Sequence, residues 1–223
     1  MIGLSPAEEN YLRTIYDLLA EGLDKVSTNE IAAAVHTKAA SVSDMLKRLA
    51  EKELIDYRKY YGVSLTEEGR KRALHIIRRH RLWEVFLVDK LKFSWDEVSA
   101  IAEELEHVKA PLLVRRLDEY LGFPKFDPHG DPIPDEFGEL SSKPRILLQE
   151  VPVGQSGKIV SVSDSSAAFL KYLDKVGIYI GAKVLVLEKT DYDGSQELFI
   201  DNQKKVFVSK EVAGNIQVML HPS

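Results

Sequence analysis

Apolar residues recur at helical spacing in the first part of the chain. The pattern predicts a helix over 4–21, whose inward face carries Leu12, Ile15, Tyr16 and Leu19. Ser27 and Glu30 match a capping box, which predicts the start of a second helix over 29–35. A third helix is predicted over 38–52 after a brief turn. Two short helices joined by a tight turn indicate a helix-turn-helix.

The period then changes from helical to alternating. Residues 54–57 and 63–65 are predicted strands, and the basic, aromatic tip 58–62 joins them into a hairpin. Thr66 is placed to cap a long helix that follows. The order of helix, helix-turn-helix, hairpin and long helix predicts a winged helix-turn-helix. A small helical domain with an incidental hairpin is the alternative.

Residues 79–108 have the pattern of two helices joined near Lys92. Ser94 and Glu97 form a second capping-box pattern at the start of the latter helix. A further helix is predicted over 112–121. This region has more apolar surface than a helical hairpin needs, at Trp83, Phe86, Trp95, Leu112, Leu113, Leu117 and Leu121. A dimer interface and a large intrachain core both explain that excess.

From Arg145 onward the pattern becomes mostly strand-like. The predicted strands are 157–163, 183–189, 197–200, 205–208 and 216–220, and one helix is predicted over 165–176. Small β elements with one inserted helix favour an SH3-like β-barrel. The predicted fold is therefore mainly α with small β, in three domains: 1–73 for DNA binding, 74–140 helical, and 141–223 barrel.

Composition narrows the classes of function. The chain has 223 residues, no cysteine and a formal net charge of −5, so disulfides, thiolate ligands and cysteine nucleophiles are excluded. We expect no signal peptide and no membrane span, and therefore a cytoplasmic protein. No nucleophile constellation or phosphate-binding loop appears, so we expect neither enzymatic activity nor a small-molecule substrate.

The charge is unevenly distributed along the chain. Residues 38–81 contain twelve Lys or Arg and six Asp or Glu, which gives a basic segment in an acidic protein. We expect Ser41, Ser43 and Asp44 to lie nearest the bases of bound DNA. The predicted phosphate contacts are Lys38, Lys47, Arg48, Arg58 and Lys59.

Acidic and imidazole side chains face each other across the predicted helical hairpin. Glu103, Glu106 and His107 share a face of the second helix at spacings of three and four residues, and the turn brings them level with His80. Two imidazoles and two carboxylates describe a divalent metal site, and a donor set without thiolate suits Mn(II), Fe(II) or Zn(II). A solvated charged face is the alternative.

In this order of elements, the chain resembles the DtxR family of metal-dependent bacterial repressors, specifically the manganese and iron regulators with a C-terminal FeoA-type domain. The matching segments are ENYLRTIYDL at 9–18, RHRLWEVFL at 79–87, EELEHV at 103–108 and DPHGDPIP at 127–134. The resemblance covers essentially the whole chain. It implies a homodimer that binds a palindromic operator when loaded with Fe(II) or Mn(II).

The resemblance also implies particular ligands. The primary metal site maps onto His80, Glu103, Glu106, His107 and Asn10, where Asn10 replaces the family's Met or Asp. Glutamate at position 103 is typical of the manganese branch. A second site maps onto Glu84, Asp127, His129 and Asp164, with Asp127 in place of a cysteine. Ser99 stands where the iron branch has another histidine ligand.

These observations predict a repressor of metal-homeostasis genes that senses Mn(II) or Fe(II). A winged-helix protein that binds DNA without metal is one alternative, and a di-metal hydrolase using the same His and Glu residues is another. A third hypothesis concerns the C-terminal domain alone, which is expected to bind a peptide segment such as the Pro-rich linker.

Overall fold

The computed structural model describes residues 3–20, 22–58, 61–140 and 144–220. These residues form two compact units that interleave along the sequence. Unit 1 consists of the described residues of Met1–His80, Glu104–Val114 and Pro134–Leu140. Unit 2 consists of those of Arg81–Glu103, Arg115–Ile133 and Ser141–Ser223. The division into three contiguous domains stays a prediction.

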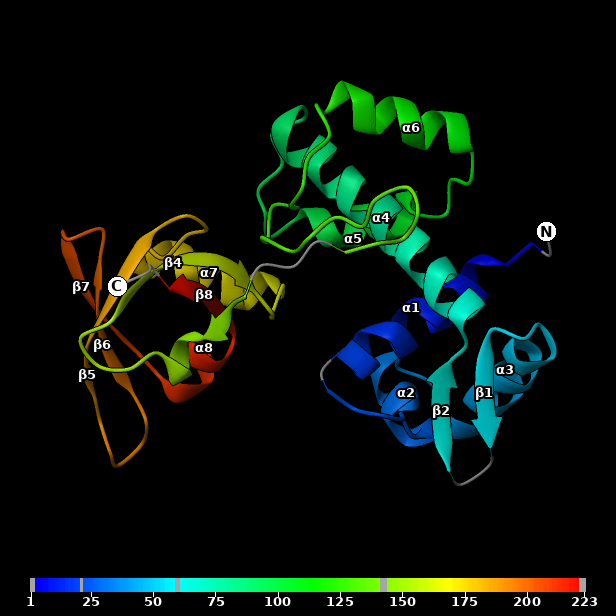
Figure 1. Cartoon of the computed structure of the whole chain (residues 1–223), viewed down its shortest axis with the longest axis horizontal. Coiled ribbons are helices and arrows are strands. Elements are labelled where there is room, and N and C mark those ends of the chain that lie inside the picture. The colour runs from blue at the N-terminus through cyan, green and yellow to red at the C-terminus, as the bar shows by residue number, and fades with distance from the viewer. Residues whose placement is uncertain (1–2, 21, 59–60, 141–143, 221–223) are drawn as a thin grey trace. The chain divides into compact units, whose positions relative to one another are not determined.

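Unit 1 contains the predicted helix-turn-helix and hairpin (Figure 1). Its helices are α1 (Pro6–Ala20), α2 (Thr28–Ala34) and α3 (Ala39–Glu51), followed by strands β1 (Ile55–Arg58) and β2 (Gly62–Leu65). The Ser27 side chain accepts a hydrogen bond from the Glu30 amide, and Glu30 reaches back to the Ser27 amide, so the predicted capping box is confirmed.

A buried apolar cluster holds the elements of unit 1 together. Its members include Leu12, Ile15, Ile31, Val42, Leu46, Leu49, Val63 and Ile76. The antiparallel hairpin pairs Ile55 with Leu65 and Arg58 with Gly62. The long helix α4 (Glu67–Asp89) follows, and the Thr66 hydroxyl accepts a hydrogen bond from the Gly69 amide as its predicted cap.

The helices after α4 are α5 (Val98–Leu105) and α6 (Pro111–Tyr120), and α5 differs from the prediction at both ends. Ser94 was predicted to cap this helix, but α5 begins four residues later and Ser94 hydrogen-bonds Glu97 in the turn before it, so that prediction was wrong. Glu106 and His107 were predicted on the second helix, but α5 ends before them, so that prediction was wrong. Residues 106–110 are a turn and an irregular link, and the chain starts again as α6 at Pro111, which suits the first position of a helix.

Unit 2 contains a six-stranded antiparallel sheet in the order β3-β8-β4-β5-β6-β7. The strands are β3 (Ile146–Leu147), β4 (Ser156–Val162), β5 (Lys183–Lys189), β6 (Gln196–Ile200), β7 (Lys204–Val208) and β8 (Ile216–Leu220). The inserted helix α7 (Ala167–Val176) begins after its N-cap, Ser166. Strand β3, the short helix η1 (Leu148–Glu150) and α8 (Lys210–Gly214) were not predicted.

The sheet packs its inner face on a core of its own. That core includes Leu148, Ile159, Leu170, Leu173, Val184, Val186, Leu198 and Ile216. Within the described residues, the edge strands β3 and β7 do not pair with each other, so the sheet is open rather than a closed barrel. No helix among the described residues is long and apolar enough to cross a membrane.

Candidate functional site

The helix-turn-helix presents a polar surface along α3. Lys38 is the N-cap residue of α3, and Lys38, Ser41, Asp44, Lys47, Arg48 and Arg58 are exposed. The Asp44 carboxylate lies 3.1 Å from Lys47 Nζ, and Ser43 Oγ donates back to the Ala39 carbonyl at 3.0 Å. Asp44 thus forms an ion pair with the neighbouring Lys47 side chain. Lys59, the remaining predicted phosphate contact, lies outside the described residues.

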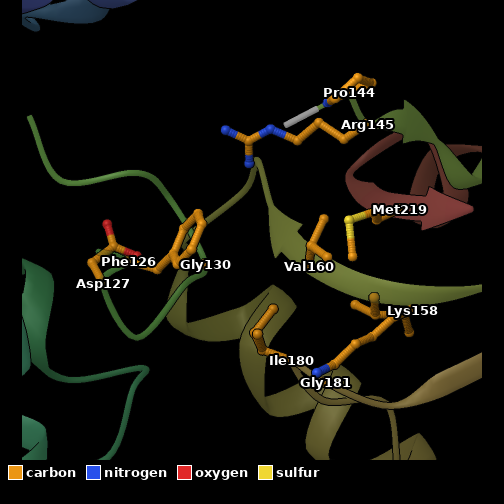
Figure 2. A pocket seen from close by; sticks show the side chains of 11 residues that line it. Phe126, Asp127, Gly130, Pro144, Arg145, Lys158, Val160, Ile180, Gly181 and Met219 are labelled. Atoms are coloured by element: carbon orange, nitrogen blue, oxygen red, sulfur yellow. The ribbon is translucent and has the colours of Figure 1, made fainter. Parts of the chain in front are cut away.

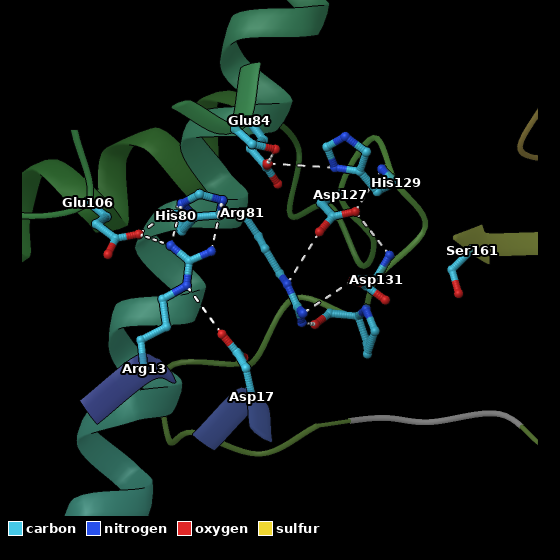
Figure 3. A network of polar contacts seen from close by, with 12 residues as sticks. Arg13, Asp17, His80, Arg81, Glu84, Glu106, Asp127, His129, Asp131 and Ser161 are labelled. Atoms are coloured by element: carbon cyan, nitrogen blue, oxygen red, sulfur yellow. Dashed lines mark hydrogen bonds and ion pairs between the residues drawn. The ribbon is translucent and has the colours of Figure 1, made fainter. Parts of the chain in front are cut away.

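In unit 1, three charged or imidazole side chains from separate elements converge (Figure 3). Glu106 Oε2 lies 2.8 Å from His80 Nδ1 on α4. Arg13 on α1 donates from Nη1 to Glu106 Oε2 at 2.6 Å, and the same nitrogen lies 3.0 Å from His80 Nδ1. His80 and Glu106 are both buried. The structure therefore brings together two of the predicted primary ligands and places a guanidinium against both.

His107 has a different partner. Its Nδ1 lies 2.7 Å from Glu9 Oε2, and Glu9 also faces Arg79 at 3.1 Å and Lys109 at 3.3 Å. A carboxylate on one ring nitrogen orients an imidazole and leaves the other nitrogen for a metal, which is the usual second contact of a metal-binding histidine. Glu9 is a buried residue of α1, so the position of the His107 ring is set by a side chain of α1.

Two buried side-chain oxygens in unit 1 lack hydrogen-bond partners, which bears on whether its residues fit a metal. Asn10 Oδ1 and Glu106 Oε1 are buried side-chain oxygens without a hydrogen-bond partner. A buried acceptor without a partner costs about 1–3 kcal/mol, more for a charged group, so it needs a physical explanation. Oxygen and imidazole donors suit Mn(II), Fe(II) and Zn(II). These residues therefore fit a divalent cation. Glu103, by contrast, is exposed.

Unit 2 contains a second, tighter cluster. Ligand atoms of Glu84, Asp127 and His129 all lie within 4.8 Å of one another, and the three residues are buried. Divalent ions bind oxygen and nitrogen at roughly 2.0–2.6 Å, so ligands on opposite sides of one ion are at most about 5 Å apart. Ser99 donates from Oγ to Glu84 Oε1 at 2.8 Å.

The histidine of this cluster has a defined orientation. His129 Nε2 lies 2.8 Å from the Trp95 carbonyl, and the two rings stack at 6.1 Å between centroids. A carbonyl only accepts, so Nε2 carries the proton. His129 Nδ1 lies 3.6 Å from Glu84 Oε1 and is the nitrogen available to a ligand.

Burial and charge shift the acidity of the cluster. Burial alone would lower the pKa of His129, but the hydrogen bond and charge of Glu84, with the charge of Asp127, raise it to about 9. Burial, with the negative charges of Glu84 and Asp131, raises the pKa of the Asp127 carboxyl to about 7. Without a cation the cluster therefore holds protons, because closely spaced buried carboxylates repel each other.

Asp127 also has the turn-capping role that is usual for an aspartate in such a loop. Its Oδ1 accepts from the amides of His129 at 2.8 Å and Asp131 at 2.9 Å, and its Oδ2 lies 3.3 Å from Arg81 Nε. Asp164, the fourth predicted residue, is outside the three-residue cluster. Its Oδ1 accepts from the Ser166 amide at 2.8 Å at the start of α7.

The loop that carries Asp127 and His129 rests directly on β4. The Val162 amide donates to the His129 carbonyl at 3.1 Å, and Gly130 has φ +85°. A Cβ on Gly130 would lie 1.8 Å from the Val160 carbonyl oxygen. Figure 2 shows Gly130 and Asp127 beside a cavity of about 330 Å³ that Arg145, Ile180 and Met219 also line. Backbone contact therefore holds the cluster's loop on the sheet.

Sequence reasoning missed two residues beside the predicted ligands, Glu9 and Arg13. Both lie on α1 and contact His107, Glu106 or His80. The available signal was the spacing of Arg13, which lies three residues after Asn10 and four after Glu9, since residues one turn apart on a helix share a face. The pairing itself joins residues about 70 to 100 positions apart, which local pattern does not reveal.

Three family models match the chain in the order of its elements. Residues 3–63 match "Iron dependent repressor, N-terminal DNA binding domain". Residues 66–135 match "Iron dependent repressor, metal binding and dimerisation domain", and residues 146–220 match "FeoA domain".

Individual proteins agree with these models. The iron-dependent repressor IdeR of Mycobacterium tuberculosis is 31% identical, over 94% of this chain and 95% of its own. A solved manganese-dependent transcriptional repressor in complex with manganese is 36% identical with a TM-score of 0.90, covering 96% of this chain and 100% of its own. The manganese regulator SloR is 32% identical with a TM-score of 0.80, covering 98% and 100%. The chain therefore belongs to the DtxR family of metal-dependent transcriptional repressors.

Proposed function

We propose that this repressor responds to Mn(II) or Fe(II) and controls genes of metal homeostasis. The observation that carries the proposal is the buried Glu106 carboxylate, which lies beside His80 and keeps Oε1 without a hydrogen-bond partner. A buried carboxylate oxygen without a donor, on a side chain next to an imidazole, favours a bound cation over a solvated charged face. Asn10 Oδ1 is a second buried oxygen of unit 1 without a partner. His107, positioned by Glu9, completes the proposed primary set, and Glu103 stays a ligand by resemblance alone.

We further propose Glu84, Asp127 and His129 as the second metal site. Their ligand atoms already lie within 4.8 Å, and Ser99 and Trp95 orient two of them. Asp164 is a weaker candidate because its Oδ1 is engaged by Ser166. Zn(II) is a possible occupant on donor chemistry. Two of the similar structures are of ScaR, one with bound Zn²⁺ and one with bound Cd²⁺.

The choice between Mn(II) and Fe(II) stays open in the proposal. The absence of cysteine and the glutamate at position 103 favour Mn(II), as does the manganese-bound repressor among the similar structures. The IdeR relatives carry the name of iron-dependent repressors. Hard oxygen ligands with imidazole suit either ion.

The elements that carry the primary ligands suggest how metal affects DNA binding. Asn10 lies on α1, which packs in the core of the helix-turn-helix, whereas His80 lies on α4. A bound cation would supply positive charge that holds these elements together. Through its bonds to Glu106 and Asn10, the cation would then keep α1 in the position that DNA binding requires. For metal to switch DNA binding on and off, it must bind the DNA-competent conformation more favourably than the incompetent one by a few kcal/mol.

We propose that the chain acts as a homodimer on a palindromic operator. Leu112 and Leu113 on α6 are 59% and 42% exposed, which is unusual for adjacent leucines on one helix. The matching family model names this region for dimerisation. Two copies related by a two-fold axis would present two α3 helices to half-sites about one DNA turn apart. We also infer that the open C-terminal sheet has an SH3-like arrangement of strands.

Metal-dependent DNA binding tests the proposal. Binding to a pool of promoter fragments is measured with chelator, with Mn(II), with Fe(II) under anaerobic conditions and with Zn(II). We expect Mn(II) or Fe(II) to switch binding on. Binding that is indifferent to chelator would support a metal-independent DNA-binding protein. Metal-dependent hydrolysis without DNA affinity would support the di-metal hydrolase.

Proton competition at the second site gives a pH prediction. His129, whose pKa is raised to about 9, must lose a proton to bind metal, and below about 7 Asp127 must lose one too. Metal affinity of this site should therefore fall about tenfold per pH unit from 9 to 7, and more steeply below 7. Calorimetry in buffers of different ionisation enthalpy would count the protons released. Affinity that is flat from pH 6 to 8 would contradict the assignment.

The α3 surface gives a salt-dependence prediction. Replacing Lys47 with Gln should weaken binding to all sequences alike and reduce the slope of log K against log salt by about 1. Asp44→Asn changes the charge of the same surface in the opposite direction, because it removes the carboxylate that lies 3.1 Å from Lys47 Nζ. We expect Asp44→Asn to strengthen nonspecific binding. Equal slopes for wild type and Lys47→Gln would remove Lys47 from the phosphate contacts.

A further inference from the structure

Arg13 occupies the position of a cation in the primary site. Its Nη1 lies 2.6 Å from Glu106 Oε2 and 3.0 Å from His80 Nδ1, and its Nη2 lies 3.4 Å from His80 Nε2 (Figure 3). The Glu106 side chain is fully buried, whereas the Arg13 side chain is 26% exposed. The guanidinium therefore enters the site from its solvent side and neutralises a carboxylate that has no access to water.

This contact competes directly with metal. Glu106 and His80 are proposed metal ligands, and the Arg13 guanidinium hydrogen-bonds the same two side chains, at Glu106 Oε2 and His80 Nδ1, while Glu106 Oε1 is left without a partner. A guanidinium keeps its charge at every pH at which a protein is folded, so it cannot leave by deprotonation. It also joins α1 to α4, which are the elements that Asn10 and His80 would join through a cation.

A second carboxylate lies beside Arg13 on its own helix. Arg13 Nε lies 3.6 Å from Asp17 Oδ2, one turn further along α1, and the Asp17 side chain is 51% exposed. Figure 3 shows the Arg13 side chain between Glu106 on one side and Asp17 on the other. A rotation of the side chain toward Asp17 would clear the site without moving the helix.

We propose that Arg13 is a built-in competitor that sets the metal threshold of this repressor. In the metal-free protein it neutralises Glu106, and on metal binding it moves to Asp17. The inference rests on the proposed primary site and adds a residue that tunes the affinity of that site. The apparent dissociation constant for metal then equals the intrinsic value divided by the fraction of molecules in which Arg13 has left.

Two substitutions should change Mn(II) affinity in opposite directions. Arg13→Gln removes the competitor, and we expect the dissociation constant to fall about tenfold, within the usual range of coupling between sites. Asp17→Asn removes the alternative acceptor, so the dissociation constant should rise severalfold. Free Mn(II) is quantified by its electron paramagnetic resonance signal, in a Glu84→Gln background that silences the second cluster.

Controls separate the failure of this inference from that of the proposed function. Arg70→Gln makes the same charge change at an exposed position of α4 and should leave the dissociation constant unchanged. Arg13→Lys keeps the charge and should give an intermediate value. Weaker Mn(II) binding by Arg13→Gln, or no change in it, would overturn the competitor role. If Glu106→Gln leaves Mn(II) binding unaltered in the same background, the primary site itself is wrong.

Discussion

Glu106→Gln is expected to weaken Mn(II)-dependent operator binding about a hundredfold while the protein stays folded. A shift from a mostly competent to a mostly incompetent population changes the apparent affinity by roughly that factor. The Glu106 side chain is fully buried, with one oxygen facing Arg13 and the other without a partner. Glutamine keeps the shape of the side chain but removes the charge that attracts a divalent ion.

The control for this substitution lies two residues away. Glu104 is exposed at the end of α5, so Glu104→Gln makes the same chemical change without touching the cluster. Operator binding is measured by fluorescence anisotropy against Mn(II) concentration, and circular dichroism checks the fold. Equal Mn(II) dependence in the two variants would mean that Glu106 is a structural partner of Arg13 rather than a ligand.

Gly130→Ala is expected to lower the free energy of unfolding by about 3 kcal/mol or more and to abolish metal binding at the second site. The φ of +85° alone costs an L residue roughly 1–2 kcal/mol. The larger effect comes from the Cβ, which would lie 1.8 Å from the Val160 carbonyl oxygen. A backbone oxygen cannot rotate away as a side chain does, so the loop must leave β4 and carry Asp127 and His129 with it.

Gly154→Ala isolates the conformational part of that effect. Gly154 has φ +83°, and nothing lies within 4 Å of the position its Cβ would take. We expect a loss of about 1 kcal/mol and unchanged metal binding. Urea unfolding monitored by tryptophan fluorescence, with Mn(II) titration of each variant, compares the two. Similar losses in both variants would show that contact between this loop and β4 contributes little to stability.

Local pattern was sufficient for most of the helices and strands. The capping box at Ser27, the cap at Thr66 and the strand over 183–189 follow from neighbouring residues in the sequence, and the structure contains all three. Periodicity failed at the ends of α5, because apolar spacing alone does not fix the residue at which a helix begins or ends. It also missed η1 and α8, which are too short to show a repeat.

The candidate metal sites show the same contrast between what local sequence indicates and what it misses. The residue types at positions 80, 84, 103, 106, 107, 127 and 129 already indicate oxygen and nitrogen ligands, and the sequence without cysteine excludes thiolate ones. Which of them meet is a matter of long-range contact. Glu84, Asp127 and His129 converge where the loop packs on β4, while Asp164 accepts a hydrogen bond from the Ser166 amide and Glu103 faces solvent.

The sequence by itself determined the family, the order of elements and the chemistry of the donors, because these depend on residue type and local spacing. Only the tertiary structure decided that Arg13 and Glu9 lie against the proposed ligands, and that Asn10 and Glu106 keep buried oxygens without partners. The reason is physical. A carboxylate acquires its properties from burial and from the charges beside it, and both depend on residues that are distant in the chain.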